Sequence, residues 1–507
     1  MPMSTSDRPA RPSPAMDGPW PVVIQGGMGV AVSSWQMARA VSQTGQLGVV
    51  SGTALDVVIA RRLQDGDLNG DVRRALEQFP VPAMATRVLD RHFREGGRTP
   101  GQSYAPVNKL HMNPTGTDLD LSIVANFAEV WLAKEGHDGV VGINFLEKVQ
   151  MATPAATYGA ILAGVDYVLM GAGIPREIPQ LLDDLAAGRP VRLPVHVDGA
   201  APESHHVELD PRGLLGVELP PLTRPFFLAI ISADALASYL ARDAHIRPDG
   251  FVIEGPSAGG HNAPPRGKVV LDDLGQPVFG PRDLADVSKV AAVGLPFWLA
   301  GSYDTPEAVV AAREAGAQGV QAGTVFALSK ESGLDPALLR QALDRLRADT
   351  LEVRTDPAAS PTGFPFKVAQ IPGTLSDARV LANRERLCDL GYLRTPYQRE
   401  SGAVGYRCPA EPVELFVSKG GDPAETVGRV CLCNALTADI GLEQTRPDGY
   451  TERALVTLGA SLVGVRRLLA LHPTGWSARE ALRWLLEGVL AQAVATTRAT
   501  TLAAADA

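Results

Sequence analysis

One stretch of the chain combines residues suited to proton transfer beside a flat ligand. The apolar run at 250–254 ends in Gly255, and Gly259-Gly260 precede a single histidine, His261. Glycine lets a backbone turn tightly or approach a planar group, because it carries no Cβ, and an imidazole exchanges protons near neutral pH. The pattern predicts a strand end that presents His261 to a ligand. A Gly-rich turn with an exposed histidine is the alternative.

Two later loops have the composition of a phosphate site. Ala300-Gly301-Ser302 and Gln321-Ala322-Gly323-Thr324 each complete a short apolar run. Backbone N–H groups at such turns and at helix N-termini bind phosphate. Neither loop has the Gly-x-x-x-x-Gly-Lys spacing of a triphosphate-binding loop. Either loop alone is explained by a tight turn, whereas the two together favour a phosphate site.

These loops must be positioned by a repeating series of strands and helices. Eight apolar runs, nearly all followed by a helical pattern, begin near residues 22, 47, 139, 165, 191, 250, 296 and 319. Continuous apolar runs are typical of parallel strands that are buried on both faces. The series therefore predicts an α/β fold, a (β/α)8 TIM barrel, whose active site lies at the C-terminal ends of the strands.

The predicted barrel occupies residues 21–368, with insertions near 87–113 and 199–225. Residues 1–20 contain several prolines and are predicted to form a disordered lead. Residues 369–507 are predicted to form a smaller, mainly helical subdomain, with helices at 379–390, 452–471 and 478–491. The subdomain carries no cofactor motif, but its apolar helix faces need cover. We therefore expect it to serve solubility rather than the chemistry.

Composition restricts the class of protein. The 507 residues carry a formal net charge of −9, which argues against non-specific nucleic-acid binding. No apolar run approaches the roughly 20 residues of a membrane span, and residues 1–20 lack the apolar core of a signal peptide. We expect a cytoplasmic enzyme with a small-molecule substrate and no membrane or nucleic-acid partner.

The four cysteines all lie between Cys388 and Cys433. Four thiolates are enough for a zinc site, but the spacing of Cys431 and Cys433 is tighter than the usual Cys-x₂₋₄-Cys knuckle. We favour buried reduced thiols and expect no metal. His205-His206, His92 and His111 show no ligand spacing and are interpreted as loop residues.

Five motifs in order give the chain a family resemblance. They are Gln25-Gly26-Gly27-Met28-Gly29, Gly142-Ile143-Asn144, Gly171-Ala172-Gly173-Ile174-Pro175, the stretch from Glu254 to His261, and Gln321-Ala322-Gly323-Thr324. Together they resemble the nitronate monooxygenase (2-nitropropane dioxygenase) family. That family includes FMN-dependent enoyl-acyl-carrier-protein reductases of fatty acid and polyketide synthases. The resemblance runs from about residue 21 to residue 366.

The resemblance implies FMN and a role for each matching residue. Met28, with Gly26 and Gly27, is expected against the isoalloxazine ring, and His261 corresponds to the active-site histidine that acts as a base toward neutral nitroalkanes. The other residues implied to contact the flavin, its ribityl chain or its phosphate are Asn144, Glu254, Gly259, Gly301, Ser302, Gln321, Gly323 and Thr324.

Three positions depart from the family pattern. Glu254 stands where the family usually has Gln, Ser257 where it often has Glu, and Ser302 where a second glycine is usual.

The resemblance leaves two alternatives for function. The first is oxidation of alkyl nitronates with O₂ to a carbonyl compound and nitrite. The second is NAD(P)H-dependent reduction of an enoyl thioester, for which the long chain and the segment from Met170 to Pro175 argue. A homo-oligomer or an acyl carrier protein is a candidate partner.

A third alternative is a non-catalytic barrel that serves as an interaction module. The set of glycines in the flavin-type loops argues against it, because a binding module has no need of them.

Overall fold

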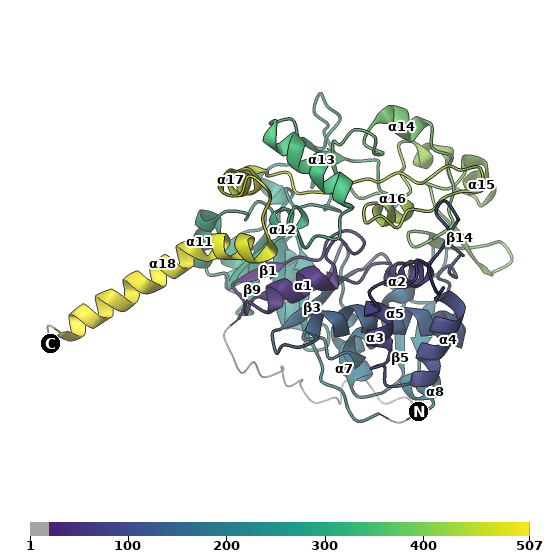
Figure 1. The fold of residues 1–507 in the computed structure, drawn as a ribbon, viewed down its shortest axis with the longest axis horizontal. Helices are drawn as coiled ribbons and strands as arrows, with labels where there is room; N and C mark the ends of the chain where they lie inside the picture. Colours follow the sequence, from purple (N-terminus) through teal and green to yellow (C-terminus); the bar gives the residue numbers. More distant parts are fainter. Residues whose placement is uncertain (1–19, 218, 506–507) are drawn as a thin grey trace.

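The computed structural model describes residues 20–217 and 219–505. Eight parallel strands close into a barrel in the order β1-β10-β9-β8-β7-β4-β3-β2 (Figure 1). The barrel strands are β1 (Val23–Gln25), β2 (Leu47–Ser51), β3 (Val141–Leu146), β4 (Tyr167–Gly171), β7 (Phe226–Ile231), β8 (Gly250–Glu254), β9 (Phe297–Ala300) and β10 (Gly319–Ala322). The predicted TIM barrel is confirmed.

Helices surround the barrel. They are α1 (Trp35–Ser42), α2 (Leu55–Gln64), α3 (Asp71–Leu76), α4 (Pro82–His92), α5 (Gly116–Lys134), η2 (Gln150–Ala152), α6 (Thr153–Leu162), α7 (Ile178–Ala186), α8 (Pro211–Leu215), α9 (Asp234–Arg242), η3 (Pro281–Asp283), α10 (Val287–Ala291), α11 (Pro306–Glu314), α12 (Thr324–Ala327) and α13 (Pro336–Arg347). The barrel interior is filled by apolar side chains such as Leu169, Val252 and Trp298, and Trp20 packs edge-on against Trp298 with ring centroids 5.7 Å apart. The rest of the predicted disordered lead, 1–19, lies outside the described residues.

The fifth barrel strand differs from the prediction. The run at 191 forms β5 (Val191–Pro194), which pairs antiparallel with β6 (His206–Leu209) outside the barrel. Along β5, buried and more exposed residues alternate, which is typical of a strand covered on one face only. The barrel strand is β7, an unbroken apolar run directly after the predicted insertion. The prediction was wrong because a one-sided alternation was taken for a continuous apolar run.

The insertion predicted at 87–113 is only partly irregular. Its first residues complete α4, which begins at Pro82, and the chain then runs without regular structure to the start of α5.

The C-terminal part contains less helix than predicted. Its elements are β11 (Val353–Asp356), β12 (Phe366–Ala369), α14 (Ala378–Ala382), β13 (Thr395–Gln398), β14 (Val404–Arg407), α15 (Val413–Ser418), η4 (Pro423–Thr426), α16 (Leu432–Ala438), α17 (Val463–Leu471) and α18 (Ala478–Ala505). The helix predicted at 379–390 is reduced to α14, and only the second half of the helix predicted at 452–471 forms, as α17. Residues 452–462 run across the barrel instead, because their backbone groups bond to barrel loops and to neighbouring segments of the C-terminal part.

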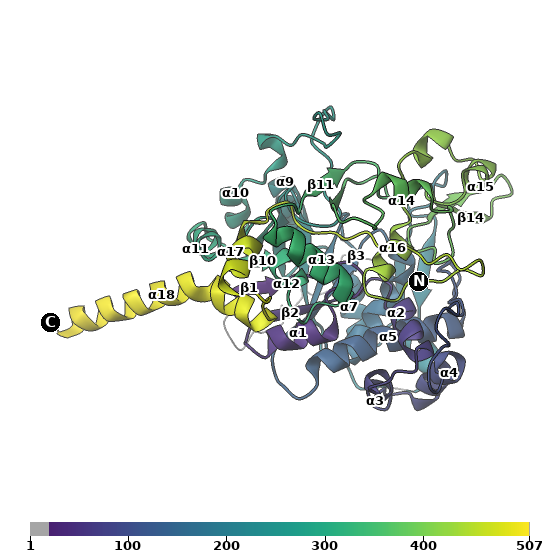
Figure 2. The same cartoon turned by 45° about the horizontal axis from the view of Figure 1, so that its top comes forward.

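The C-terminal part shares its core with the barrel. Leu455, Trp476 and Leu482 belong to the same buried cluster as barrel residues such as Val325, and Trp476 Nε1 donates to the Val325 carbonyl at 2.6 Å. Figures 1 and 2 show these elements gathered on one side of the molecule, away from α3 and α4, with α18 projecting from the body. The part from 369 onward is thus joined to the barrel by a continuous core.

Among the described residues, no helix combines the length and the apolar character needed to cross a membrane.

Candidate functional site

One cavity opens where barrel strands β1, β8, β9 and β10 end. It holds about 800 Å³ of empty space, within the size range of cofactor and small-molecule pockets. Every residue predicted to contact the cofactor lines it, apart from Asn144. The lining consists of Gly26–Gly29, Glu254, Ser257–Gly260, Ala300–Asp304, Gln321–Thr324, Ala327, Thr457–Gly459 and Ser461. The fold therefore brings three of the five sequence motifs, together with the Ala300-Gly301-Ser302 loop, to one place.

Asn144 lies next to this cavity without lining it. It is on β3, and a Cβ placed on Gly27 would come within 2.4 Å of the Asn144 Cβ. Real Cβ atoms do not approach one another this closely, so only glycine fits at position 27. The contact fixes how near the Gly26–Met28 loop lies to the strand that carries Asn144.

The turn after β9 is held in a conformation that few residues adopt. Gly301 has φ +90° and Ser302 has φ +62°. A non-glycine residue in this region is uncommon and strained, and such strain gathers at functional sites. Ser302 Oγ donates a 2.8 Å hydrogen bond to Ser257 Oγ, so the loops after β8 and β9 are joined across the cavity wall.

Gln321 leaves an acceptor unused. It is the third residue of β10, and its side chain packs against Gly26. Its Oε1 is buried and has no hydrogen-bond partner in the protein. A buried acceptor without a partner costs stability, and this one is on a residue that lines the cavity. A ligand N–H group would satisfy it.

Glu254 is the most perturbed carboxyl group of the cavity. Burial raises its pKa to about 7, and the nearby Lys367 ammonium partly opposes the rise. Lys367 is itself buried, and burial lowers its pKa to about 8. Its Nζ donates to the Pro256 carbonyl at 2.7 Å and to Thr355 Oγ1 at 2.5 Å. Lys367 thus fixes the loop that follows Glu254.

Sequence reasoning missed Lys367. Its signal was a lone lysine in the apolar run Phe366-Lys367-Val368, because a buried lysine needs partners.

His261 lies behind the cavity wall and does not line it, in contrast to its predicted place at the mouth of a strand. Its Nε2 shares a 2.7 Å hydrogen bond with Ser360 Oγ, and its ring stands edge-on to Phe366, with centroids 4.8 Å apart. Burial lowers the pKa of His261 to about 4, with a further contribution from the Lys148 ammonium. The imidazole is therefore neutral at pH 7 and is a weaker base than an exposed histidine.

The C-terminal part also contributes to the cavity. Thr457, Leu458, Gly459 and Ser461 line it, so the expected separation between chemistry in the barrel and solubility in the tail does not hold. The sequence did carry a signal against the helix predicted at 452–471. It was the run of small residues in Thr457-Leu458-Gly459-Ala460-Ser461, because a glycine inside a predicted helix weakens the helix assignment.

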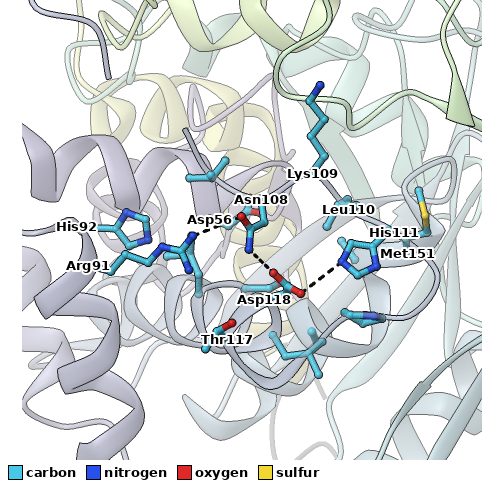
Figure 3. A pocket seen from close by; sticks show the side chains of 17 residues that line it. Asp56, Arg91, His92, Asn108, Lys109, Leu110, His111, Thr117, Asp118 and Met151 are labelled. Atoms are coloured by element: carbon cyan, nitrogen blue, oxygen red, sulfur yellow. Dashed lines mark hydrogen bonds and ion pairs between the residues drawn. The ribbon is translucent and has the colours of Figure 1, made fainter. Parts of the chain in front are cut away.

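A second pocket lies between α4, α5 and the loop at 107–111 (Figure 3). Its polar side chains bond to one another. Asn108 accepts from Arg91 at 3.3 Å and donates to Asp118, and the other oxygen of Asp118 lies 3.3 Å from His111 Nε2. No residue predicted for the cofactor site lines this pocket.

The four cysteines come together in one cluster. Cys408 and Cys431 are buried, with Cys388 and Cys433 packed against them. Within residues 20–217 and 219–505, no group of three or more His, Cys, Asp or Glu side chains is arranged to hold a metal ion. All four thiols are free.

Comparisons with solved structures give likenesses of low identity. FabK from Thermotoga maritima is 16% identical, with 95% of this chain and 96% of that chain covered and a TM-score of 0.48. A nitroalkane oxidase from Streptomyces ansochromogenes is also 16% identical, with 94% and 97% covered and a TM-score of 0.44. The enoyl reductase domain of MlnA from Bacillus amyloliquefaciens is 11% identical, with 96% and 97% covered and a TM-score of 0.45. No curated protein matches the chain.

One family model matches directly. Residues 226–360 match the family described as nitronate monooxygenase. This segment contains strands β7 to β10, His261, and the loops that carry Glu254, Gly301 and Gly323. The resemblance predicted from the motifs is thereby confirmed over these residues.

Proposed function

We propose that this protein is an FMN-dependent oxidoreductase that oxidises alkyl nitronates with O₂ to a carbonyl compound and nitrite. The observation that carries the proposal is the convergence of the flavin motifs on one cavity, whose residue Gln321 keeps a buried acceptor without a protein partner.

The residues present fit FMN. Gly26, Gly27 and Met28 form a thin wall for the flat ring, and the Gln321 oxygen can accept from a ring N–H group. The loops after β9 and β10 form the opposite end of the cavity, where the phosphate would bind. Bound FMN would supply a centre that takes two electrons from the substrate.

Within the part of the chain that the structure describes, the phosphate end has no cationic side chain, and Asp304 of the β9 loop also lines it. Among the described residues, the cavity lining contains neither lysine nor arginine. A phosphate there would be bound by hydroxyl groups such as those of Thr324 and Ser302, and by the first N–H groups of α12, which have no partner within the helix. A single small phosphate site suits FMN, and the sequence shows no second nucleotide motif for FAD.

The position of His261 favours a nitronate over a neutral nitroalkane. A nitronate has already lost its α-proton, so its oxidation needs no strong base. A histidine with a pKa of about 4 is a weak proton acceptor at neutral pH. The hydrogen bond with Ser360 fixes the orientation of the neutral imidazole ring.

A second candidate function is the reduction of an enoyl thioester with NAD(P)H. Glu254 favours it, because a carboxyl group with a pKa of about 7 at the cavity wall is partly protonated at neutral pH. Reduction of a double bond needs a proton donor as well as a hydride. The family's usual Gln cannot supply that proton.

One experiment tests both functions. The purified protein is mixed anaerobically with a nitronate, NADPH or NADH, and the flavin absorbance is followed. Bleaching by the nitronate alone supports the first function, and bleaching by a nicotinamide followed by reoxidation with an enoyl thioester supports the second. Denaturation should release FMN. Release of FAD, or no flavin after reconstitution with FMN, would refute the cofactor assignment.

A further inference from the structure

Residues 457–461 line the cavity and bond to the loops after β8 and β10. The Gly260 N–H donates to Thr457 Oγ1, the Gly459 N–H donates to Thr324 Oγ1, and the Ala460 N–H donates to the Ser257 carbonyl, each at 2.8 Å. One of these contacts reaches Thr324, which the family resemblance implies in flavin binding, and another reaches Gly260, the neighbour of Gly259. The third reaches the residue that bonds Ser302.

We propose that segment 457–461 is part of the cofactor site and orients the Thr324 hydroxyl toward the FMN phosphate. This inference rests on the proposed FMN dependence and adds to it. It assigns a cofactor-positioning role to a segment more than 100 residues beyond β10, outside the match to the nitronate monooxygenase model.

The hydroxyl of Thr324 provides the chemical reason. A hydroxyl has one donor hydrogen and two acceptor lone pairs. Because Thr324 Oγ1 already accepts from the Gly459 N–H, its hydrogen is directed away from that N–H group. Thr324 begins α12 and lines the cavity. Its free hydrogen can then be donated to an anion at the start of the helix, where a cavity without cations most needs donors.

The segment is also anchored on its far side. Asp304, at the end of the β9 loop, accepts a 3.1 Å hydrogen bond from the Gly464 N–H and weaker ones from Ser461 Oγ at 3.4 Å. The first turn of α17 is thereby fixed to the same loop that carries Gly301 and Ser302. Segment 457–461 is thus held by the loop after β8 at its start and by the loop after β9 at its end.

The test enlarges Gly459, whose N–H donates to the Thr324 hydroxyl. A Cβ on Gly459 would lie 3.0 Å from Thr324 Oγ1 and meets nothing closer. Gly459→Ala therefore crowds the hydroxyl. Gly116→Ala is the matched control, because a Cβ there meets no atom within 4 Å and α5 begins far from the cavity. Apoprotein of each variant is titrated with FMN and with riboflavin, which lacks the phosphate.

We expect Gly459→Ala to raise the Kd for FMN about 10-fold, as for the loss of one hydrogen bond to a charged group. The Kd for riboflavin should stay within about twofold of the wild-type value. Gly116→Ala should leave both unchanged. Equal losses for the two flavins, or no loss for either, would overturn the inference. If the wild type binds no flavin, the proposed function itself fails.

A second variant tests the other end of the segment and does not depend on steric crowding. Thr457→Val keeps the shape of the side chain but removes the acceptor for the Gly260 N–H. Because Gly259 and Gly260 lie at the predicted ring end, the variant's affinity for FMN and for riboflavin should fall alike, by about 3- to 10-fold.

Limited proteolysis gives an independent measurement. FMN should protect the chain near residue 460 from cleavage in the wild type. An unprotected segment, or unchanged affinity in Thr457→Val, would contradict the proposal.

Discussion

Two pockets of this protein, with about 560 and 800 Å³ of empty space, differ in how their polar groups are satisfied. In the pocket between α4 and α5, Asp118 bonds to Asn108, His111 and Thr115, so its charge is balanced within the protein (Figure 3). In the cavity at the barrel strand ends, the Gln321 acceptor is unpaired and the Glu254 carboxyl is held with a raised pKa. Satisfied polar groups stabilise a fold, whereas unsatisfied ones mark a place for a ligand.

The largest expected effect comes from a charge in the phosphate end of the cavity. Gly323→Asp should abolish FMN retention, with a loss of affinity of at least about 100-fold, because a carboxylate would stand close to the phosphate. Gly116→Asp is the matched change beside the other pocket, at the start of α5, where an acidic residue is favourable. The flavin content of the two purified variants is measured by absorbance. A yellow Gly323→Asp protein would contradict the placement of the phosphate.

His261→Ala should lower activity by an amount that depends on the substrate. A positioned base contributes roughly 10²–10⁴-fold, and the low pKa of His261 places it at the weak end of that range. We expect about 10²-fold slower turnover of neutral nitroalkanes and much less change with pre-formed nitronates, with FMN still bound. Steady-state rates with both substrate forms test this. Equal losses would indicate a general binding role instead.

Glu254→Gln should change how stability depends on pH. The folded pKa of Glu254 is raised from 4.5 to about 7, so between these values the folded state holds a proton that the unfolded state has lost. Stability from this group is complete below pH 4.5 and is lost as pH rises toward 7. The variant lacks this loss and should melt roughly 2–4 °C higher than the wild type above pH 7. Thermal unfolding of both apoproteins from pH 5 to 8 measures this difference in melting temperature. Parallel curves would show that Glu254 does not titrate there.

The smallest effect is expected at the satisfied pocket. Burial would raise the pKa of Asp118, but hydrogen bonds from the Thr115 N–H and hydroxyl outweigh it and lower the pKa to about 2. Its contribution to stability is present above pH 3.8 and is lost as pH falls toward 2. Asp118→Asn should cost about 1 kcal/mol at pH 7, as for the loss of a helix cap, and leave the Kd for FMN unchanged. A weakened FMN affinity would mean that the two pockets are coupled.

The sequence by itself determined the type of fold and most of the predicted residues that line the cavity at the barrel strand ends. Strands such as Leu47–Ser51 and Gly250–Glu254 can be predicted from their own residues, because a strand buried on both faces is apolar along its length. The glycines after them are equally visible, because only glycine tolerates a backbone approach such as that of Gly27 to Asn144. Local chemistry was sufficient wherever a residue's role depends on its own backbone.

Only the tertiary structure decided which segments meet. It excluded β5 from the barrel in favour of β7, since strand choice depends on which run can be covered on both faces. It packed the half-buried His261 against Ser360 and Phe366 and placed Lys367 near Glu254, and so set pKa values that the spacing of residues in the sequence does not reveal. It also laid residues 457–461 over the cavity, where their N–H groups bond to barrel loops instead of to a helix. Contacts between residues distant in sequence depend on packing of the whole chain, and that information is not local.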